Sequence, residues 1–153
     1  MYTIKNPETA IIKFRNEYLF LSNFYEGKIF TYKGCKFTNT EAAFHSQKDP
    51  KRIKEFQMLR PSQSKKLGRK VNLRDDWEEV KDQIMYEVCY AKFTQDLSLK
   101  SRLLNTKDVE LIEGNNHGDR CWGMTYDLNY KQLIGDNRLG IILMKIRDDL
   151  RNK

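Results

Sequence analysis

The stretch DDWEEVKDQIMYEVCYAKFT, from Asp75 to Thr94, is the longest segment of the chain with one clear periodicity. Its apolar residues recur three and four positions apart, which is the spacing that lines one face of an α-helix. These residues are Trp77, Val80, Ile84, Val88 and Ala91. The stretch therefore predicts a long helix at the centre of the hydrophobic core.

Shorter segments on both sides of this helix predict a mixed architecture. The runs 10–14, 18–20 and 28–32 are brief, apolar and separated by turn residues, which is typical of short strands in a small antiparallel sheet. Other helices are expected over residues 41–48, 50–58, from 61 onward, 97–104 and 138–151, with a strand over 109–112 and a loop over 114–123. The predicted fold class is α+β, mainly helical with a small antiparallel sheet.

The length and composition of the chain favour one soluble domain. Its 153 residues suffice for one hydrophobic core, so residues 1–153 are predicted to form a single domain. The longest strongly apolar run, from Leu139 to Met144, is far shorter than the roughly 20 residues that cross a bilayer. The N-terminus shows no secretory signal. We therefore expect a cytoplasmic protein with no membrane partner.

Charge and cysteine content narrow the partners further. The chain has 28 Lys and Arg against 21 Asp and Glu, and the formal charge of +7 favours anionic partners such as phosphates or nucleic acid. Its three cysteines are far apart in sequence, which indicates reduced thiols rather than disulfides or a zinc site. His45 and His117 form no metal-spaced pair with a cysteine or an acid, so neither a metal nor a cofactor is expected.

An acid, an imidazole and an amine share one face of the helix predicted over residues 41–48. Glu41, His45 and Lys48 are four and seven residues apart, so their side chains should converge. The structural alternative is that Glu41 completes a capping box begun by Thr38, while Lys48 is a favourable cation at the helix C-terminus. The residues alone leave both interpretations open.

The loop 115–123 contains a second pair of candidates. Asp119 precedes Trp122 by three residues, between Gly118 and Gly123. An indole can stack on a flat base while the acid stays near the sugar. The alternative is a tight turn in which Asp119 bonds to the backbone and Trp122 fills the core.

Two further stretches offer polar contacts to a ligand. Arg69, in the basic run 61–71, can hold a phosphate through two parallel hydrogen bonds, or the run is a solvated helix face. Asn23, between Ser22 and Phe24, can offer amide bonds to a base or ribose, or belongs to a plain turn. The chain has no P-loop and no dinucleotide-binding glycine motif.

Several short pieces of the chain occur in a recognisable order. They are Phe20–Phe24, Thr40–Ala42, Gln47–Lys48, Leu67–Arg69, Trp77, Ala91–Phe93, Leu103–Thr106, Leu111–Glu113, Asp119, Trp122–Gly123, Gly135–Gly140 and Leu143–Met144. Each piece is a weak signal, but the ordered set is specific and resembles the NADAR (YbiA-like) family over nearly the whole chain, from about Phe14 to Leu150.

The resemblance implies a YbiA-like α+β fold and N-glycosidase activity on phosphorylated ribosides. Members of the family are associated with ribosylaminopyrimidine phosphates of the riboflavin pathway, and others with ADP-ribose attached to guanine in nucleic acid. The polar, often acidic residue expected before the tryptophan is replaced by Cys121 in this chain. The preference between the two substrates therefore stays open.

The resemblance also implies roles for individual residues. Glu41 and Asp119 match catalytic acids, and Lys48 matches a lysine thought to act covalently. The residues that match substrate contacts are Asn23, Arg69, Trp77 and Trp122.

The chemistry of N-glycoside cleavage agrees with these roles. Breaking the C–N bond places positive charge on the anomeric carbon and ring oxygen, which a carboxylate of Glu41 or Asp119 would stabilise. One of these acids can also protonate the departing base. A neutral amine can hold the opened sugar as a Schiff base, and Lys48 is the first choice for it, with Lys92 as the alternative.

Two other functions stay open at this point. A binding module could use the same contacts to recognise ADP-ribose or a related nucleotide without cutting it. A nucleic-acid-binding protein would use the +7 charge and would lose affinity steeply with added salt. The natural substrate, the pathway and the oligomeric state are not readable from the sequence.

Overall fold

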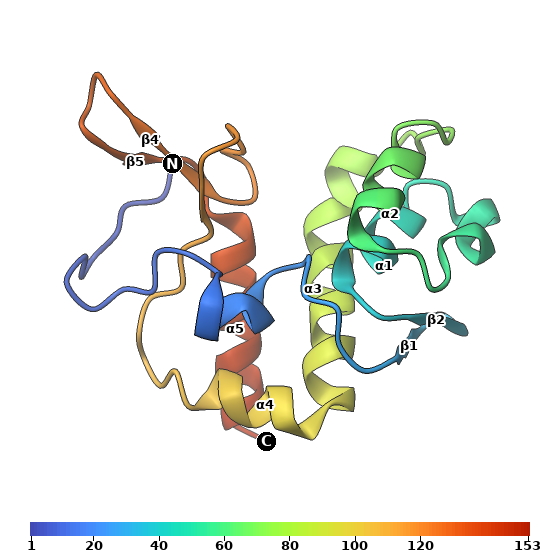
Figure 1. Ribbon diagram of the computed structural model, residues 1–153, viewed down its shortest axis with the longest axis horizontal. Coiled ribbons are helices and arrows are strands. Elements are labelled where there is room, and N and C mark those ends of the chain that lie inside the picture. Colours follow the sequence, from blue (N-terminus) through green and yellow to red (C-terminus); the bar gives the residue numbers. More distant parts are fainter. The chain divides into compact units, whose positions relative to one another are not determined.

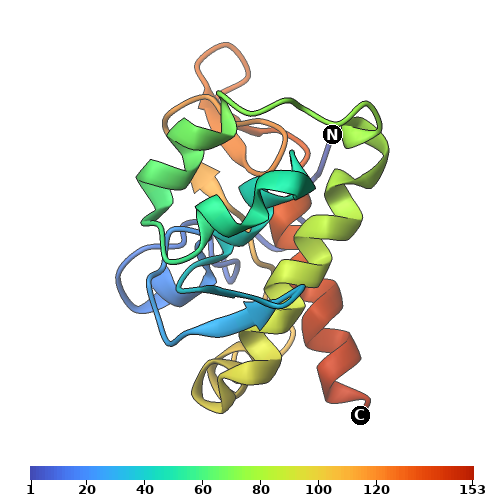
Figure 2. The same cartoon turned by 90° about the vertical axis from the view of Figure 1, so that its right-hand side faces the viewer.

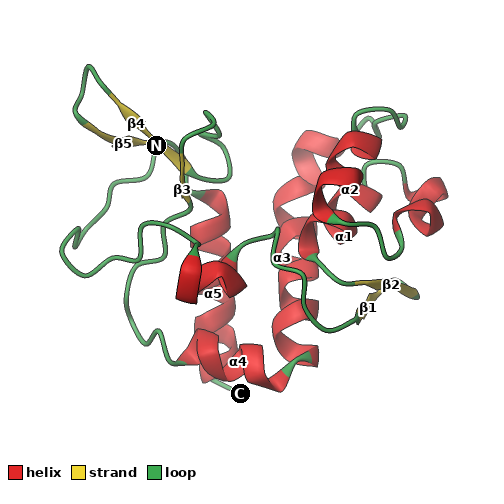
Figure 3. Cartoon of the chain, in the orientation of Figure 1, coloured by secondary structure: helices red, strands yellow, loops and turns green.

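The computed structural model describes all residues from Met1 to Lys153 and divides the chain into two compact units (Figure 1). One unit consists of residues 23–101, and the other combines residues 1–22 with residues 102–153. Figure 3 shows that both units combine helices with short strands, and that loops make up much of the unit of residues 1–22 and 102–153. The predicted α+β class is confirmed. No helix has both the length and the hydropathy needed to span a membrane.

The unit of residues 23–101 begins with a hairpin. Strands β1 (Phe30–Tyr32) and β2 (Cys35–Phe37) pair antiparallel, with Phe30 opposite Phe37. Lys33 and Gly34 form the turn at positive φ values of 51° and 76°, the conformation that two-residue hairpin turns of the right twist require. The strand predicted at 28–32 is therefore confirmed in its last three residues, but its antiparallel partner is β2, which is not among the predicted strands.

Helices complete this unit. They are α1 (Thr40–Ser46), the 3-10 helix η2 (Pro50–Phe56), α2 (Pro61–Gly68), α3 (Trp77–Gln95) and the start of α4 (Leu97–Leu104). Helix α1 packs against α2, η2 and α3, an arrangement that can be followed in Figure 2.

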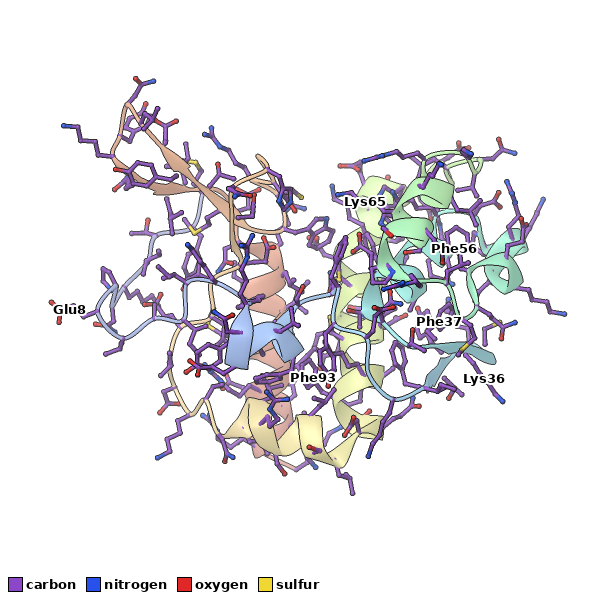
Figure 4. All side chains as sticks on the ribbon, in the orientation of Figure 1. Glu8, Lys36, Phe37, Phe56, Lys65 and Phe93 are labelled. Carbon is purple, nitrogen blue, oxygen red and sulfur yellow. The ribbon has the colours of Figure 1, made fainter.

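The predicted long helix is confirmed as α3, which provides much of the core of its unit. Its buried side chains are Trp77, Ile84, Met85, Val88, Cys89, Lys92 and Phe93. Phe37 of β2 and Phe56 of η2 are also fully buried, and Figure 4 marks both with Phe93.

The other unit contains a three-stranded sheet and a long helix. Strand β4 (Met124–Asp127) lies between β3 (Gly114–Asn115), to which it is parallel, and β5 (Gln132–Ile134), to which it is antiparallel. Helix α5 (Arg138–Arg151) buries Leu139, Leu143, Ile146 and Leu150, as its periodicity predicts.

The start of α5 is hydrogen-bonded to, and closely packed on, the segment before β3. Asn137 has a left-handed φ of 50° and is completely buried. Its amide accepts from the Glu113 N–H at 2.9 Å and donates to the Leu111 carbonyl at 3.0 Å. Gly140 lies so close to this carbonyl that a Cβ atom would come within 2.1 Å of the oxygen. The motif Gly135–Gly140 therefore has a structural role.

Some predicted elements differ from the structure. The strand predicted at 18–20 is wrong, because these residues belong to the 3-10 helix η1 (Asn16–Leu21). The segments 10–14 and 109–112 form no strands beyond a single parallel β-bridge between Ile11 and Leu111. The helix predicted at 50–58 is of the 3-10 type, and the sheet formed by β3, β4 and β5 was not predicted.

Candidate active site

The N-terminus of α1 directs Glu41 into the interior of its unit. The N-cap is Asn39, whose Oδ1 accepts from the Ala42 N–H at 2.8 Å. The predicted capping box of Thr38 and Glu41 is therefore wrong. The N-cap is Asn39, one residue after Thr38, and its side chain accepts from the N–H of Ala42. The Glu41 carboxylate is instead 3.0 Å from the ring of His45, one turn further on.

Asn23 anchors the chain beside this helix. Its carbonyl accepts from the Glu41 N–H at 3.1 Å, and its Oδ1 accepts from the Thr40 hydroxyl at 2.8 Å. Its Nδ2 donates to the Met85 sulfur at 3.5 Å. A thioether is a weak acceptor, so an oxygen of a ligand could compete for this N–H.

Lys48 lies two residues beyond the end of α1. It is half-buried, and its Nζ is 5.7 Å from the ring centroid of Trp77. Burial is the largest cause that lowers the pKa of Lys48, and the positive charges of Arg69 and Lys65 lower it further, whereas Glu41 acts in the opposite direction. A lowered pKa increases the fraction of neutral, nucleophilic amine.

Trp77 forms a wall behind Lys48 rather than an open stacking platform. Only 7% of the residue is exposed at the start of α3. Its ring packs on Phe44 of α1 with the centroids 5.0 Å apart. Arg69, which follows the last turn of α2, is exposed.

Positive charge is concentrated in the segment 50–70, which comprises η2, α2 and their connections. The segment has eight basic residues and one acid, Glu55, so its formal charge of +7 equals that of the whole chain. Arg52 pairs with Glu55, and Arg60 pairs with Glu26. Lys65, labelled on α2 in Figure 4, and Arg69 both act on the pKa of Lys48, which places this charge near the amine.

Asp119 and Trp122 lie in the other unit. The Oδ1 atom of Asp119 accepts from the N–H groups of Cys121 and Trp122 at 3.1 and 3.0 Å. The Asn115 side chain holds the backbone of Asp119. Its Oδ1 atom accepts from the Asp119 N–H at 3.0 Å, and its Nδ2 atom donates to the Asp119 carbonyl at 2.9 Å. The predicted turn is present. It orients the Asp119 carboxylate through Oδ1, and these hydrogen bonds do not involve Oδ2. Trp122 is half-buried.

The structure thus brings one group of predicted residues together. Asn23, Glu41, Lys48 and Trp77 are gathered around α1, with Arg69 close enough to influence the amine. Sequence reasoning missed Asn115, although an amide four residues before Asp119 is a possible signal. No group of three or more His, Cys, Asp or Glu side chains is arranged to hold a metal ion.

Comparisons with known proteins identify relatives of the chain. The NADAR domain model matches residues 12–151. A protein of Vibrio vulnificus named as a riboflavin biosynthesis protein is 35% identical over 138 residues, which are 86% of this chain and 35% of the relative. N-glycosidase YbiA of Escherichia coli is 34% identical over 122 residues, which are 76% of this chain and 72% of YbiA.

The fold is similar to that of YbiA as well. The NMR structure of Escherichia coli YbiA matches with a TM-score of 0.75 and 28% identity, over 99% of this chain and 94% of YbiA. By sequence and fold the chain is similar to proteins named N-glycosidases, a class of hydrolases that act on N-glycosyl compounds. The chain belongs to the NADAR domain family. It spans only about a third of the length of the Vibrio relative, 35%.

Proposed function

We propose that the protein hydrolyses the N-glycosidic bond of a phosphorylated riboside. The observation that carries this proposal is the buried Glu41 carboxylate, together with a half-buried Lys48 amine whose pKa is lowered and is influenced by that carboxylate. Both residues stand in a chain that groups with N-glycosidases.

Glu41 would stabilise the cationic transition state. As the bond between the anomeric carbon and the base nitrogen breaks, positive charge develops on the sugar. A carboxylate held in a partly desolvated position interacts strongly with that charge and needs no reorganisation. Asp119 is proposed as the second acid, which donates a proton to the base, and Trp122 as the ring that stacks on it.

Lys48 would form a transient imine with the sugar. As the base leaves, the neutral amine bonds to C1 of the sugar cation and loses a proton, and cleavage of the bond between C1 and the ring oxygen, with protonation of that oxygen, gives the imine. Addition of water then releases the sugar phosphate and regenerates the amine. Lys92 is the alternative: burial lowers its pKa to about 8, but the charges that act on it are those of Cys89 and Asp96 rather than of Glu41.

The basic segment 50–70 would hold the phosphate. Arg69 is exposed, and its positive charge lowers the pKa of Lys48. It is therefore the proposed phosphate ligand, with Lys65 as a second positive charge. Asn23 is proposed to contact the ribose through Nδ2, and Trp77 to shape the wall behind Lys48. We further propose that residues 1–153 act as one functional domain, which predicts a single unfolding transition.

The substrate we propose first is a ribosylaminopyrimidine phosphate, because the name of the Vibrio relative belongs to riboflavin biosynthesis. ADP-ribose on guanine in nucleic acid is the second candidate, since the concentrated positive charge suits a polyanion. The test is to incubate the protein with each compound and to identify the products by mass spectrometry. A free base with the matching sugar phosphate supports hydrolysis, whereas tight binding without products supports a binding module.

A further inference from the structure

His45 is the hydrogen-bond partner of the Glu41 carboxylate. Its Nε2 lies 3.0 Å from Oε2 of Glu41, one helical turn away on α1. The contact is shielded from solvent, since 9% of the His45 side chain and 11% of the Glu41 side chain are exposed.

The opposite edge of the His45 ring is closed by α2. The Nδ1 atom has no hydrogen-bond partner although it is buried. Gly68, the last residue of α2, approaches so closely that a Cβ atom there would lie 2.7 Å from Nδ1. Phe44 packs at 5.6 Å between ring centroids, with the two rings inclined by 68°.

These contacts determine where the imidazole proton resides. A proton on Nδ1 would be a buried donor without an acceptor, which is costly, whereas a proton on Nε2 has the Glu41 carboxylate as its acceptor. With a proton on both nitrogens the Nδ1–H would be the same buried donor without an acceptor. The hydrogen-bonding surroundings therefore favour a ring whose proton lies on Nε2 alone.

We propose that His45 is a positioning residue for Glu41. In the neutral Nε2–H form it donates to Oε2 and holds the carboxylate in one orientation, so that Oε1 is available to the developing cation. Gly68 sets the ring position because only a residue without Cβ fits against Nδ1. The inference rests on the proposed N-glycosidase function, but the protonation state of His45 can be tested without it.

Substitutions test the positioning role. His45→Gln keeps an N–H donor and should retain kcat within about threefold, whereas His45→Leu should lower kcat about tenfold to a hundredfold with little change in KM. Gly68→Ala should lower kcat in the same way, and Ser62→Ala, on the exposed face of α2, serves as the matched control. Equal kcat values for the Leu and Gln variants would overturn the role of His45.

Nitrogen NMR tests the proton position directly. In a His117→Asn background, which removes the other, exposed histidine, the ¹⁵N shifts should show Nε2 protonated and Nδ1 unprotonated at neutral pH. A proton on Nδ1, or on both nitrogens, contradicts the inference. If the wild-type protein cleaves no riboside, the proposed function fails while the NMR result still decides the state of His45.

Discussion

Replacing Glu41 by glutamine separates its charge from its structural role. The amide oxygen of Gln can still accept from His45 Nε2, and Asn39 rather than residue 41 caps the helix. The fold should therefore persist, with a Tm within about 2 °C of the wild-type value, because no contact that holds α1 is lost.

The expected loss of turnover follows from Coulomb's law. A carboxylate about 4 Å from a unit positive charge, at an effective dielectric constant of about 20, contributes about 4 kcal/mol. The charge is partial in the transition state, so the loss in kcat should be about a hundredfold to a thousandfold. Substrate binding should change little, because the charge appears only as the bond breaks.

The assay measures release of the free base by Glu41→Gln, with Glu79→Gln as the matched control. Glu79 is an exposed acid on α3 in the same unit, and its replacement should leave kcat unchanged. If well-folded Glu41→Gln turns over within threefold of the wild type, Glu41 is not the residue that stabilises the cation.

Other predictions address the amine, the base contact and the fold. Borohydride added during turnover should attach a sugar-derived mass to the Lys48 peptide, and Lys48→Arg should abolish both trapping and activity; a mass on Lys92 would transfer the role. Because Lys48 must be neutral, kcat/KM, whose pH dependence follows the groups of the free enzyme, should rise with pH to a midpoint below the ordinary lysine range. Arg69→Gln should move that midpoint to higher pH, since a cation that lowers the pKa of Lys48 is lost. Trp122→Ala should weaken substrate affinity more than it lowers the Tm, whereas normal affinity with a collapsed Tm would make Trp122 a core residue. Gly140→Ala should lower the free energy of unfolding by about 1–3 kcal/mol in denaturant titrations, because its Cβ would meet the Leu111 carbonyl. An unchanged denaturant midpoint would contradict this close packing of α5 on Leu111.

The long helices could be predicted because their periodicity is repeated over several turns. Helix α5 has the predicted bounds, and α3 differs from its prediction by one or two residues at each end. Short apolar runs carry no comparable repetition. Residues 18–20 satisfy their backbone locally, through bonds such as Tyr18 N–H to the Arg15 carbonyl at 2.9 Å, and therefore form a turn of 3-10 helix instead of a strand.

The site was predictable in its local part only. Spacing along one helix brought Glu41 and His45 together, as observed. The closure of His45 by Gly68 and the anchoring of Asn23 to Thr40 and Met85 join residues far apart in sequence, and such contacts follow from packing rather than from any local pattern. The roles of Asp119 and Trp122 stay predictions.

The causes that lower the pKa of Lys48 would respond differently to a bound substrate. A phosphate held by Arg69 and Lys65 would cancel part of their positive field, and that contribution to the lowered pKa would weaken. Burial is the larger cause, and it would increase as the substrate covers the amine. The attraction to Glu41, which favours the charged amine, would weaken as the sugar cation develops beside the carboxylate. Burial would therefore keep the amine reactive in the complex, and Arg69 would act mainly in binding, so Arg69→Gln should raise KM more than it lowers kcat near the pH optimum.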